Sequence, residues 1–160
     1  MQLKPLRSLQ GPIRVLFVCH GNICRSPMAE YVLKDMVAKR GLEDAFFIDS
    51  AATSTEELGN GVHHGTRRAL LAHGVPCGDH RARQVGRADA GAWDVIVGMD
   101  SYNMRNLQRM LPGDVERMHL LLEFAGRTRN VADPWYTGDF ETTYNDVADG
   151  CEGLLHYLGF

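Results

Sequence analysis

The sequence predicts one α/β domain, a four-stranded parallel sheet with helices on both faces. Three observations indicate this fold. Strand-like and helix-like segments alternate along the chain, the strand-like segments are almost continuously apolar, and the 160 residues are 44% hydrophobic and 23% charged, as in an ordinary compact domain. In such folds the functional loops follow the carboxyl ends of the strands, so those loops are where a site is expected.

Four segments have the character of buried strands. The first is IRVLFV, a β-branched and aromatic run, and the others are FFIDSA, WDVIVGM and RMHLLLEF. They occupy residues 13–18, 46–51, 93–99 and 117–124. The first of these segments suits a strand that is buried on both faces.

Helices are expected between and after these strands. Residues 27–40 begin with a proline suited to a first helical turn, residues 65–74 end in glycine, and residues 101–111 follow a capping Asp100. A long loop holding Asp133 precedes a closing helix that begins near Asp139. That helix carries one apolar stripe at three- and four-residue spacing: Tyr144, Val147, Cys151, Leu154, Leu155 and Leu158.

Composition excludes several classes of function. Seventeen Lys and Arg against twenty Asp and Glu give a net charge of -3 without long charged blocks, so we expect no nucleic-acid partner. Apolar runs are too short for a membrane-spanning helix or a secretory leader, and the four cysteines are too sparse for a disulfide scaffold. We therefore expect a cytoplasmic monomer with free thiols, residues 13–160 forming the domain and residues 1–12 a loosely ordered extension.

The loop after the first strand carries the chemistry. Cys19 and Arg25 are separated by five residues between a buried strand and a helix start. A loop of this length can turn its backbone N–H groups inward, and with the helix dipole behind them they form an anion site. Gly21 and Asn22 are the residues best suited to positive φ in that loop. The pattern predicts a phosphate-binding loop over residues 19–26.

Within that loop Cys19 is predicted to be a nucleophile. Inward amides, a helix amino terminus and Arg25 all favour its thiolate, and the guanidinium matches two phosphate oxygens at once. Ser26 can donate its hydroxyl to the sulfur and so help it leave. The sequence thus indicates a phosphomonoester hydrolase that attacks phosphorus with sulfur. The alternative is that Cys19 merely fills core space at a strand end.

Phosphoryl transfer also needs a proton donor for the leaving oxygen. Asp133 is the best candidate, because it precedes Pro134 in a loop after the last strand, from which it can reach over a pocket. Taken alone, Asp-Pro is also an ordinary turn.

Residues 15–27, VLFVCHGNICRSP, resemble the signature of the low-molecular-weight protein tyrosine phosphatases. The resemblance continues through residues 49–54, 80–84, 99–100 and 133–136 and so covers nearly the whole chain from Ile13 onward. It implies a four-stranded parallel sheet, Cys19 as nucleophile, Arg25 as phosphate clamp and Asp133 as general acid. It further implies that no metal or cofactor is needed and that phosphate and similar oxyanions inhibit.

The same resemblance assigns supporting residues. It implies that Asn22, Ser50 and His80 form a network that holds the loop, which includes His20, Gly21, Ile23 and Cys24, although sequence alone would place His80 on the surface. Trp135 and Tyr136 would wall the cleft for the ring of phosphotyrosine, unless they are core residues. Glu56 is a departure, because the family usually has an aromatic residue there. A carboxylate at the rim would repel a dianion or favour a basic peptide.

Two further expectations concern specificity and oxidation. Ile23 matches the tyrosine phosphatases, whereas similar phosphoarginine phosphatases carry threonine there, so a phosphotyrosine protein is the expected substrate. Cys24 is near enough to capture an oxidised Cys19 as a disulfide, a reversible switch in the family, or it is an inert neighbour. Cys77 and Cys151 are expected to be structural.

Three other functions remain as alternatives. An arsenate reductase has a similar fold and loop but relays electrons through a close pair of further cysteines, and Cys77 has no second cysteine within a short segment. A module that binds phosphotyrosine without cleaving it would not need the full set of Cys19, Arg25 and Asp133. Zinc held by Cys19 and Cys24 lacks the usual ligand spacing.

Overall fold

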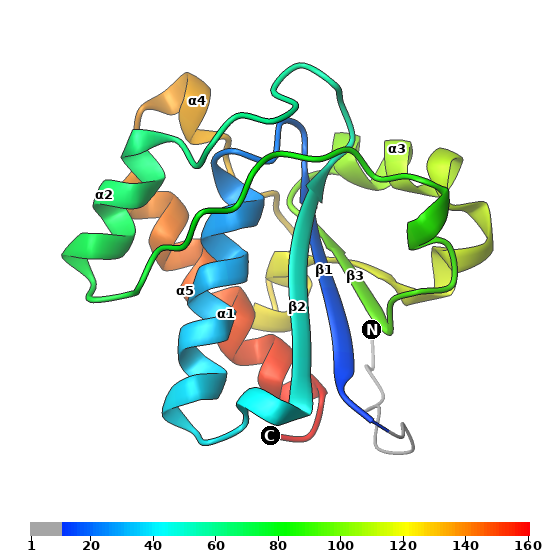
Figure 1. Cartoon of the computed structure of the whole chain (residues 1–160), viewed down its shortest axis with the longest axis horizontal. Helices are drawn as coiled ribbons and strands as arrows, with labels where there is room; N and C mark the ends of the chain where they lie inside the picture. The colour runs from blue at the N-terminus through cyan, green and yellow to red at the C-terminus, as the bar shows by residue number, and fades with distance from the viewer. Residues whose placement is uncertain (1–10) are drawn as a thin grey trace.

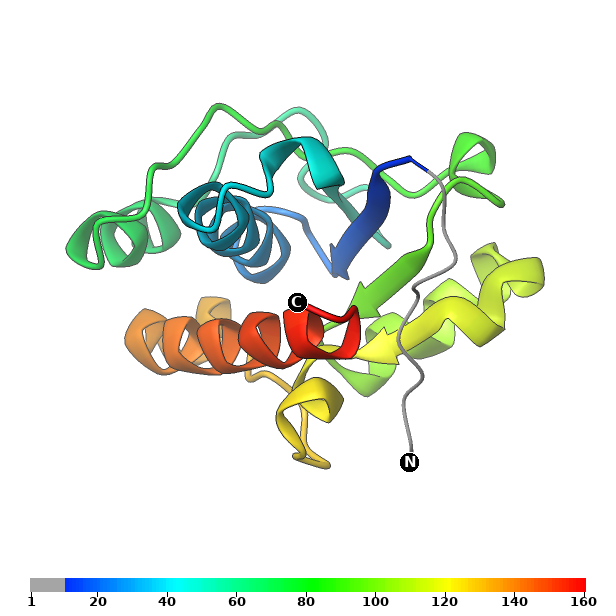
Figure 2. The same ribbon diagram turned by 90° about the horizontal axis from the view of Figure 1, so that it is seen from below.

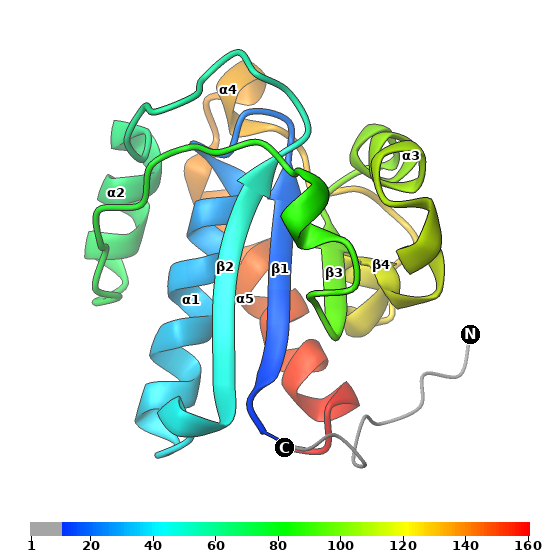
Figure 3. The same cartoon turned by 45° about the vertical axis from the view of Figure 1, so that its right-hand side comes forward.

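The computed structural model describes residues 11–160, so residues 1–10 of the predicted extension lie outside the described residues. Four parallel strands form one sheet in the order β2-β1-β3-β4 (Figure 3). Their bounds are β1 Ile13–Cys19, β2 Phe46–Ala52, β3 Val95–Gly98 and β4 Met118–Leu120. The parallel α/β fold predicted from the sequence is confirmed.

Five α-helices occur in the described part of the chain (Figure 1). They are α1 Arg25–Lys39, α2 His64–Ala72, α3 Ser101–Met110, α4 Pro134–Thr137 and α5 Phe140–Tyr157, and short 3₁₀ helices lie at Glu43–Ala45, Arg87–Asp89, Pro112–Arg117 and Leu121–Ala125. Asp100 caps α3 through Oδ1, which accepts from the N–H of Asn103 at 2.8 Å, as predicted. None of the helices formed by residues 11–160 is both long and apolar enough to cross a membrane.

The helices lie on both faces of the sheet (Figure 2). Alternate residues of β1 belong to separate clusters: Val15 and Phe17 pack with residues of α1, α2 and α5, whereas Leu16 and Val18 pack with Leu107 of α3. The alternation follows from the two-residue period of a strand. It explains why β1 is apolar and buried from Val15 to Cys19, as a central strand of a doubly covered sheet must be.

The fourth strand is shorter than predicted. Only Met118–Leu120 pairs with β3, and Leu121–Ala125 turns into a 3₁₀ helix although Leu121 and Leu122 are fully buried. A continuous apolar run does not distinguish a buried strand from another buried segment, which is why the prediction ran too far. Leu121 packs on α5 where Gly150 leaves room, since a Cβ at Gly150 would collide with it.

The residues that follow Asp133 also differ from the predicted long loop. Pro134–Thr137 forms the short helix α4, and Asp133 is its N-cap, with Oδ1 accepting from the N–H of Trp135 at 3.0 Å. A cap-Pro sequence favours such a helix start, a signal that the long-loop prediction overlooked. The cap fixes one oxygen of the Asp133 carboxylate and leaves the other facing Arg25.

Candidate active site

The loop of residues 19–26 joins β1 to α1 at the carboxyl edge of the sheet (Figure 1). Asn22 has φ +60°, and it is the only residue other than glycine with positive φ in the described part of the chain. Gly21 does not have positive φ, so that part of the prediction was wrong. A Cβ at Gly21 would approach Glu57 Cγ to 3.3 Å, and this close contact with the neighbouring loop is what favours glycine.

The sulfur of Cys19 lies among hydrogen-bond donors at the base of the loop. Cys19 Sγ is 3.0 Å from the hydroxyl of Ser26, and it accepts from the backbone N–H groups of Asn22 at 3.3 Å and Ser26 at 3.5 Å. Ser26 Oγ also accepts from the Asn22 amide at 2.8 Å, and when Cys19 is a thiolate, which has no proton, the Ser26 hydroxyl donates to the sulfur. Donors in this arrangement stabilise negative charge on the sulfur.

Asn22 lies at the centre of a buried hydrogen-bond network behind the loop. Its amide donates to Ser50 Oγ at 2.9 Å, and its Oδ1 accepts from His80 Nε2 at 2.7 Å and from the backbone N–H of Arg83 at 3.2 Å. These contacts hold the left-handed conformation of Asn22, which is unfavourable for most residues. Asn22, Ser50 and His80 are therefore in the mutual contact that the resemblance implied.

His80 is not a surface residue, contrary to the expectation from sequence alone. Its side chain is only 10% exposed, with Nδ1 lying 3.4 Å from Glu30 and 3.7 Å from Asp49. Glu30 Oε1 also accepts from Ser50 at 2.6 Å. The sequence analysis missed Glu30 and Asp49, although an acid in a largely buried stretch of a helix is a signal for a polar partner.

Glu30, Asp49 and His80 bring one possible metal-ligand atom each within 4.8 Å of one another. Their oxygens already have partners, however. Lys34 Nζ lies 2.6 Å from Glu30 Oε2, and Arg83 donates to Asp49 Oδ2 at 3.1 Å. The three side chains therefore form part of a charged, hydrogen-bonded support beneath the loop.

Arg25 is buried and held in place by three acceptors. Nη1 donates to Asp100 at 2.8 Å and to the carbonyl oxygen of Val131 at 2.9 Å, and Nη2 donates to Asp133 at 3.4 Å. Burial alone would lower the pKa of Arg25, but the sulfur of Cys19 and the bond to Asp100 outweigh it and raise the pKa above its ordinary value. The guanidinium stays charged, and its plane is fixed before any ligand binds.

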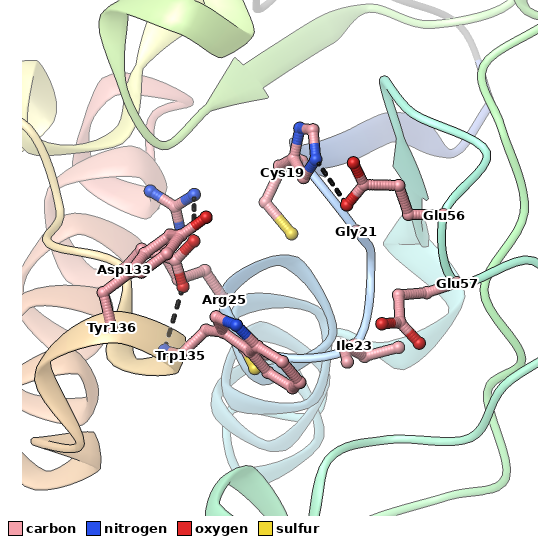
Figure 4. A pocket seen from close by; sticks show the side chains of 11 residues that line it. Cys19, Gly21, Ile23, Arg25, Glu56, Glu57, Asp133, Trp135 and Tyr136 are labelled. Carbon is pink, nitrogen blue, oxygen red and sulfur yellow. Dashed lines mark hydrogen bonds and ion pairs between the residues drawn. The ribbon is translucent and has the colours of Figure 1, made fainter.

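One pocket opens above Cys19 and gathers most of the predicted residues (Figure 4). In that view Asp133 and Tyr136 lie on one side of the sulfur, whereas Glu56 and Glu57 lie on the other, with Trp135 extending between them. Its lining comprises Cys19, His20, Gly21, Ile23, Cys24, Arg25, Glu56, Glu57, Asp133, Trp135 and Tyr136. Asn22 and Ser26 belong to the loop but do not line the pocket, and Ser50 and His80 lie behind the loop.

The rim of the pocket is aromatic on one side and acidic on the other. Trp135 and Tyr136 are 57% and 83% exposed, so they are not core residues. The rings of His63 and Trp135 meet nearly at right angles with their centroids 5.6 Å apart, a contact that sequence analysis missed. His20 Nε2 donates to Glu56 Oε2 at 3.0 Å, because a carboxylate can only accept. Glu56, the residue that departs from the family pattern, is therefore hydrogen-bonded to a residue of the phosphate-binding loop.

Cys24 lines the same pocket as Cys19 but differs from it in setting. Burial, followed by the negative charge of neighbouring Cys19, raises the pKa of Cys24 to about 12. It is therefore a neutral thiol at physiological pH. All four cysteines are free thiols.

A parallel α/β fold with a thiol, a guanidinium and inward amides at its carboxyl edge defines a class of small proteins built to bind and process an oxyanion. Residues 14–159 match the family model described as low molecular weight phosphotyrosine protein phosphatase. The chain belongs to this family of hydrolases. The match confirms the resemblance, fold and enzyme class predicted from the sequence.

Relatives extend along nearly the whole chain. Low molecular weight protein-tyrosine-phosphatase YfkJ of Bacillus subtilis is 42% identical over 147 residues, covering 89% of this chain and 94% of the relative. Its crystal structure matches with a TM-score of 0.88, covering 92% and 94% of the two chains at 39% identity. The structure of a drosophila arginine phosphatase matches with a TM-score of 0.84 at 31% identity, covering 92% and 99%.

Proposed function

We propose that this chain hydrolyses phosphotyrosine in proteins, and aryl phosphate monoesters generally, through a phosphocysteine formed on Cys19. The observation that carries the proposal is the Cys19 sulfur, which lies in a pocket with a hydroxyl and two backbone N–H groups around it and Arg25 beside it. The names of the relatives, among them YfkJ, support the same activity.

In the proposed reaction the phosphate dianion enters the loop of residues 19–26 and is held by its backbone N–H groups and by Arg25. The thiolate of Cys19 attacks phosphorus, the bond to the tyrosine oxygen breaks, and Asp133 gives that oxygen its proton. Asp133, now a carboxylate, then removes a proton from the water that attacks the phosphocysteine. The sulfur leaves as a thiolate that Ser26 stabilises, and phosphate is released.

Substrate choice depends on the rim. Trp135 and Tyr136 present exposed rings beside the pocket, and such rings bind an aryl group by stacking and apolar contact. Ile23 adds an apolar side chain to the lining. Because one structural relative is an arginine phosphatase, phosphoarginine is the alternative substrate.

A comparison of three phosphopeptides tests the proposed substrate. With one peptide sequence carrying phosphotyrosine, phosphoserine or phosphoarginine, we expect kcat/KM for phosphotyrosine to exceed both others by about tenfold or more, because only its ring reaches the aromatic rim. Steady-state phosphate release measures the three values. A higher kcat/KM for phosphoarginine would show that the substrate assignment is wrong while leaving the cysteine chemistry intact.

Replacing Glu56 with Trp is expected to tighten binding of phosphotyrosine. A ring would replace the carboxylate opposite Trp135, and one added aromatic contact lowers KM by roughly 2- to 12-fold for about 0.5–1.5 kcal/mol. Glu56→Gln is the matched control, because it removes the charge without adding a ring. Glu56→Gln should lower kcat/KM more for peptides with Lys or Arg beside the phosphotyrosine than for neutral peptides. If kcat/KM changed equally for both kinds of peptide, Glu56 would have no role in selecting basic peptides.

We also propose that Cys24 protects Cys19 from irreversible oxidation. Peroxide converts Cys19 to a sulfenic acid, and the sulfur of Cys24 displaces its hydroxyl as water to form a disulfide. After peroxide treatment and then dithiothreitol, Cys24→Ser should recover markedly less activity than the unmodified chain. Because the thiolate fraction of Cys24 rises tenfold per pH unit below a pKa of about 12, disulfide formation should speed up from pH 7 to 9. Equal recovery in both proteins would reject the idea.

The proposed chemistry suits a reducing compartment and a single chain. A nucleophilic thiol stays active where cellular thiols keep it reduced, which favours the cytoplasm. Cys19, Arg25 and Asp133 all belong to this chain and line one pocket, so the proposed reaction needs no residue from a second subunit, and we propose a monomer. Phosphate and related oxyanions should compete with substrate for the loop.

A further inference from the structure

The segment that carries Asp133 has little backbone support of its own. Residues 126–133 contain neither helix nor strand, and residues 126–130 are exposed. The N–H of Arg127 bonds to the carbonyl of Leu122 at 2.9 Å, and the N–H of Val131 bonds to that of Met99 at 2.9 Å. Between these two points the segment is held through side chains.

The carboxylate of Asp146 accepts hydrogen bonds from both arginines of this segment, Arg127 and Arg129. Arg129 donates to its two oxygens at 2.7 and 2.9 Å, and Arg127 donates to Oδ1 at 3.3 Å. Asp146 lies in the middle of α5 and is only 4% exposed, and the next residue, Val147, is fully buried. The carboxylate is therefore a buried point to which the partly exposed arginine side chains of the segment attach.

Among residues 126–133 only Val131 is buried, at 1% exposed, so apolar packing holds the end of the segment but not its exposed residues 126–130. The hollow between the segment, α4 and α5 is lined by Ala132, Thr137, Asp139, Thr142, Thr143 and Asp146, and of residues 126–133 only Ala132 contributes to it. Asp149, one turn further along α5, contacts only Arg127, at 2.9 Å, and is largely exposed. Asp146 is thus the buried partner of the pair and Asp149 the solvated one.

We propose that Asp146 is a positioning residue for Asp133. By holding Arg127 and Arg129 it sets the path of residues 127–131, and therefore the distance at which the Asp133 carboxyl faces the leaving oxygen above Cys19. The N-cap bond to Trp135 and the contact with Arg25 orient the carboxyl, while Asp146 places the backbone that carries it. This inference rests on the proposed role of Asp133 as general acid.

Hydrolysis of aryl phosphates with good and poor leaving groups tests it. Asp146→Asn keeps the shape but turns amide hydrogens toward guanidinium groups, so the segment loses its attachment. We expect kcat/KM for phenyl phosphate to fall at least tenfold more than that for p-nitrophenyl phosphate, since a misplaced acid matters most when the leaving oxygen needs its proton. Asp149→Asn is the matched control and should keep the ratio of the unmodified chain. Equal losses on the two esters in Asp146→Asn would overturn the proposal.

Two further variants separate the possible failures. Arg129→Gln breaks the same contact from the other side and should give the same change in ratio, which covers the case in which Asp146→Asn does not fold. In an Asp133→Ala background, Asp146→Asn should change the ratio no further. If Asp133→Ala itself leaves the ratio unaltered, the general acid assignment falls and this inference with it. If Asp133→Ala alters the ratio but Asp146→Asn and Arg129→Gln do not, Asp133 remains the general acid and the positioning role of Asp146 is wrong.

Discussion

Replacing Cys19 with Ser is expected to abolish turnover, lowering kcat on the order of 10⁴-fold or more, while the variant still binds phosphate. A serine hydroxyl keeps its proton at neutral pH and is a far weaker nucleophile than a thiolate, so phosphorus is not attacked. The loop amides and Arg25 remain, and they supply the anion site. Single-turnover kinetics and titration calorimetry with inorganic phosphate measure the two quantities.

Cys77→Ser is the matched control, because Cys77 is a partly exposed thiol that does not line the pocket. It should retain normal turnover. Mass spectrometry after rapid acid quench of the unmodified chain should find a phosphoryl group on Cys19. If Cys19→Ser retained substantial turnover, or if no phosphocysteine formed at position 19, the proposed mechanism would be wrong.

Most of the fold could be predicted because its signals are local. The apolar run of β1 and the stripe of α5 each depend on residues close together in sequence, and both elements occur where predicted. The end of β4 could not be predicted, because it depends on Gly150, about thirty residues away, which lets Leu121 approach α5. Packing between distant segments decides such boundaries.

The site residues likewise fall into those that a local sequence signal could predict and those that depend on contacts between distant segments. Cys19, Arg25 and Ser26 stand out because one short loop contains them all. Asp100 was assigned only to capping α3, yet its second oxygen accepts from Arg25, so one carboxylate both starts a helix and orients the guanidinium. A cap at the carboxyl end of β3, beside the central strand, was the available signal. Asp146 gave none, because its partners lie 17 and 19 residues earlier in the sequence and meet it only in three dimensions.

Replacing Asp133 with Ala is expected to lower kcat/KM for poor leaving groups by about 10²- to 10⁴-fold, the usual contribution of a general acid. Asp133 faces the pocket from the N-terminus of α4, opposite the acidic rim (Figure 4). Phenyl phosphate must expel a basic oxygen, so it needs the proton, whereas p-nitrophenyl phosphate expels a stable anion and should lose much less.

Asp133→Asn distinguishes the loss of the acidic proton from the loss of the N-cap of α4. Asn keeps the N-cap, since its side-chain oxygen can still accept from the N–H of Trp135, but it has no acidic proton to give. It should therefore show the same dependence on leaving group as Asp133→Ala, with the fold of α4 preserved. Because Asn cannot ionise, no carboxylate at this position can compete with phosphate for Arg25, so phosphate should bind at least as tightly as in the unmodified chain. Similar losses for both esters would mean that the proton reaches the leaving oxygen from another group, and Asp133 would then be only the cap of α4.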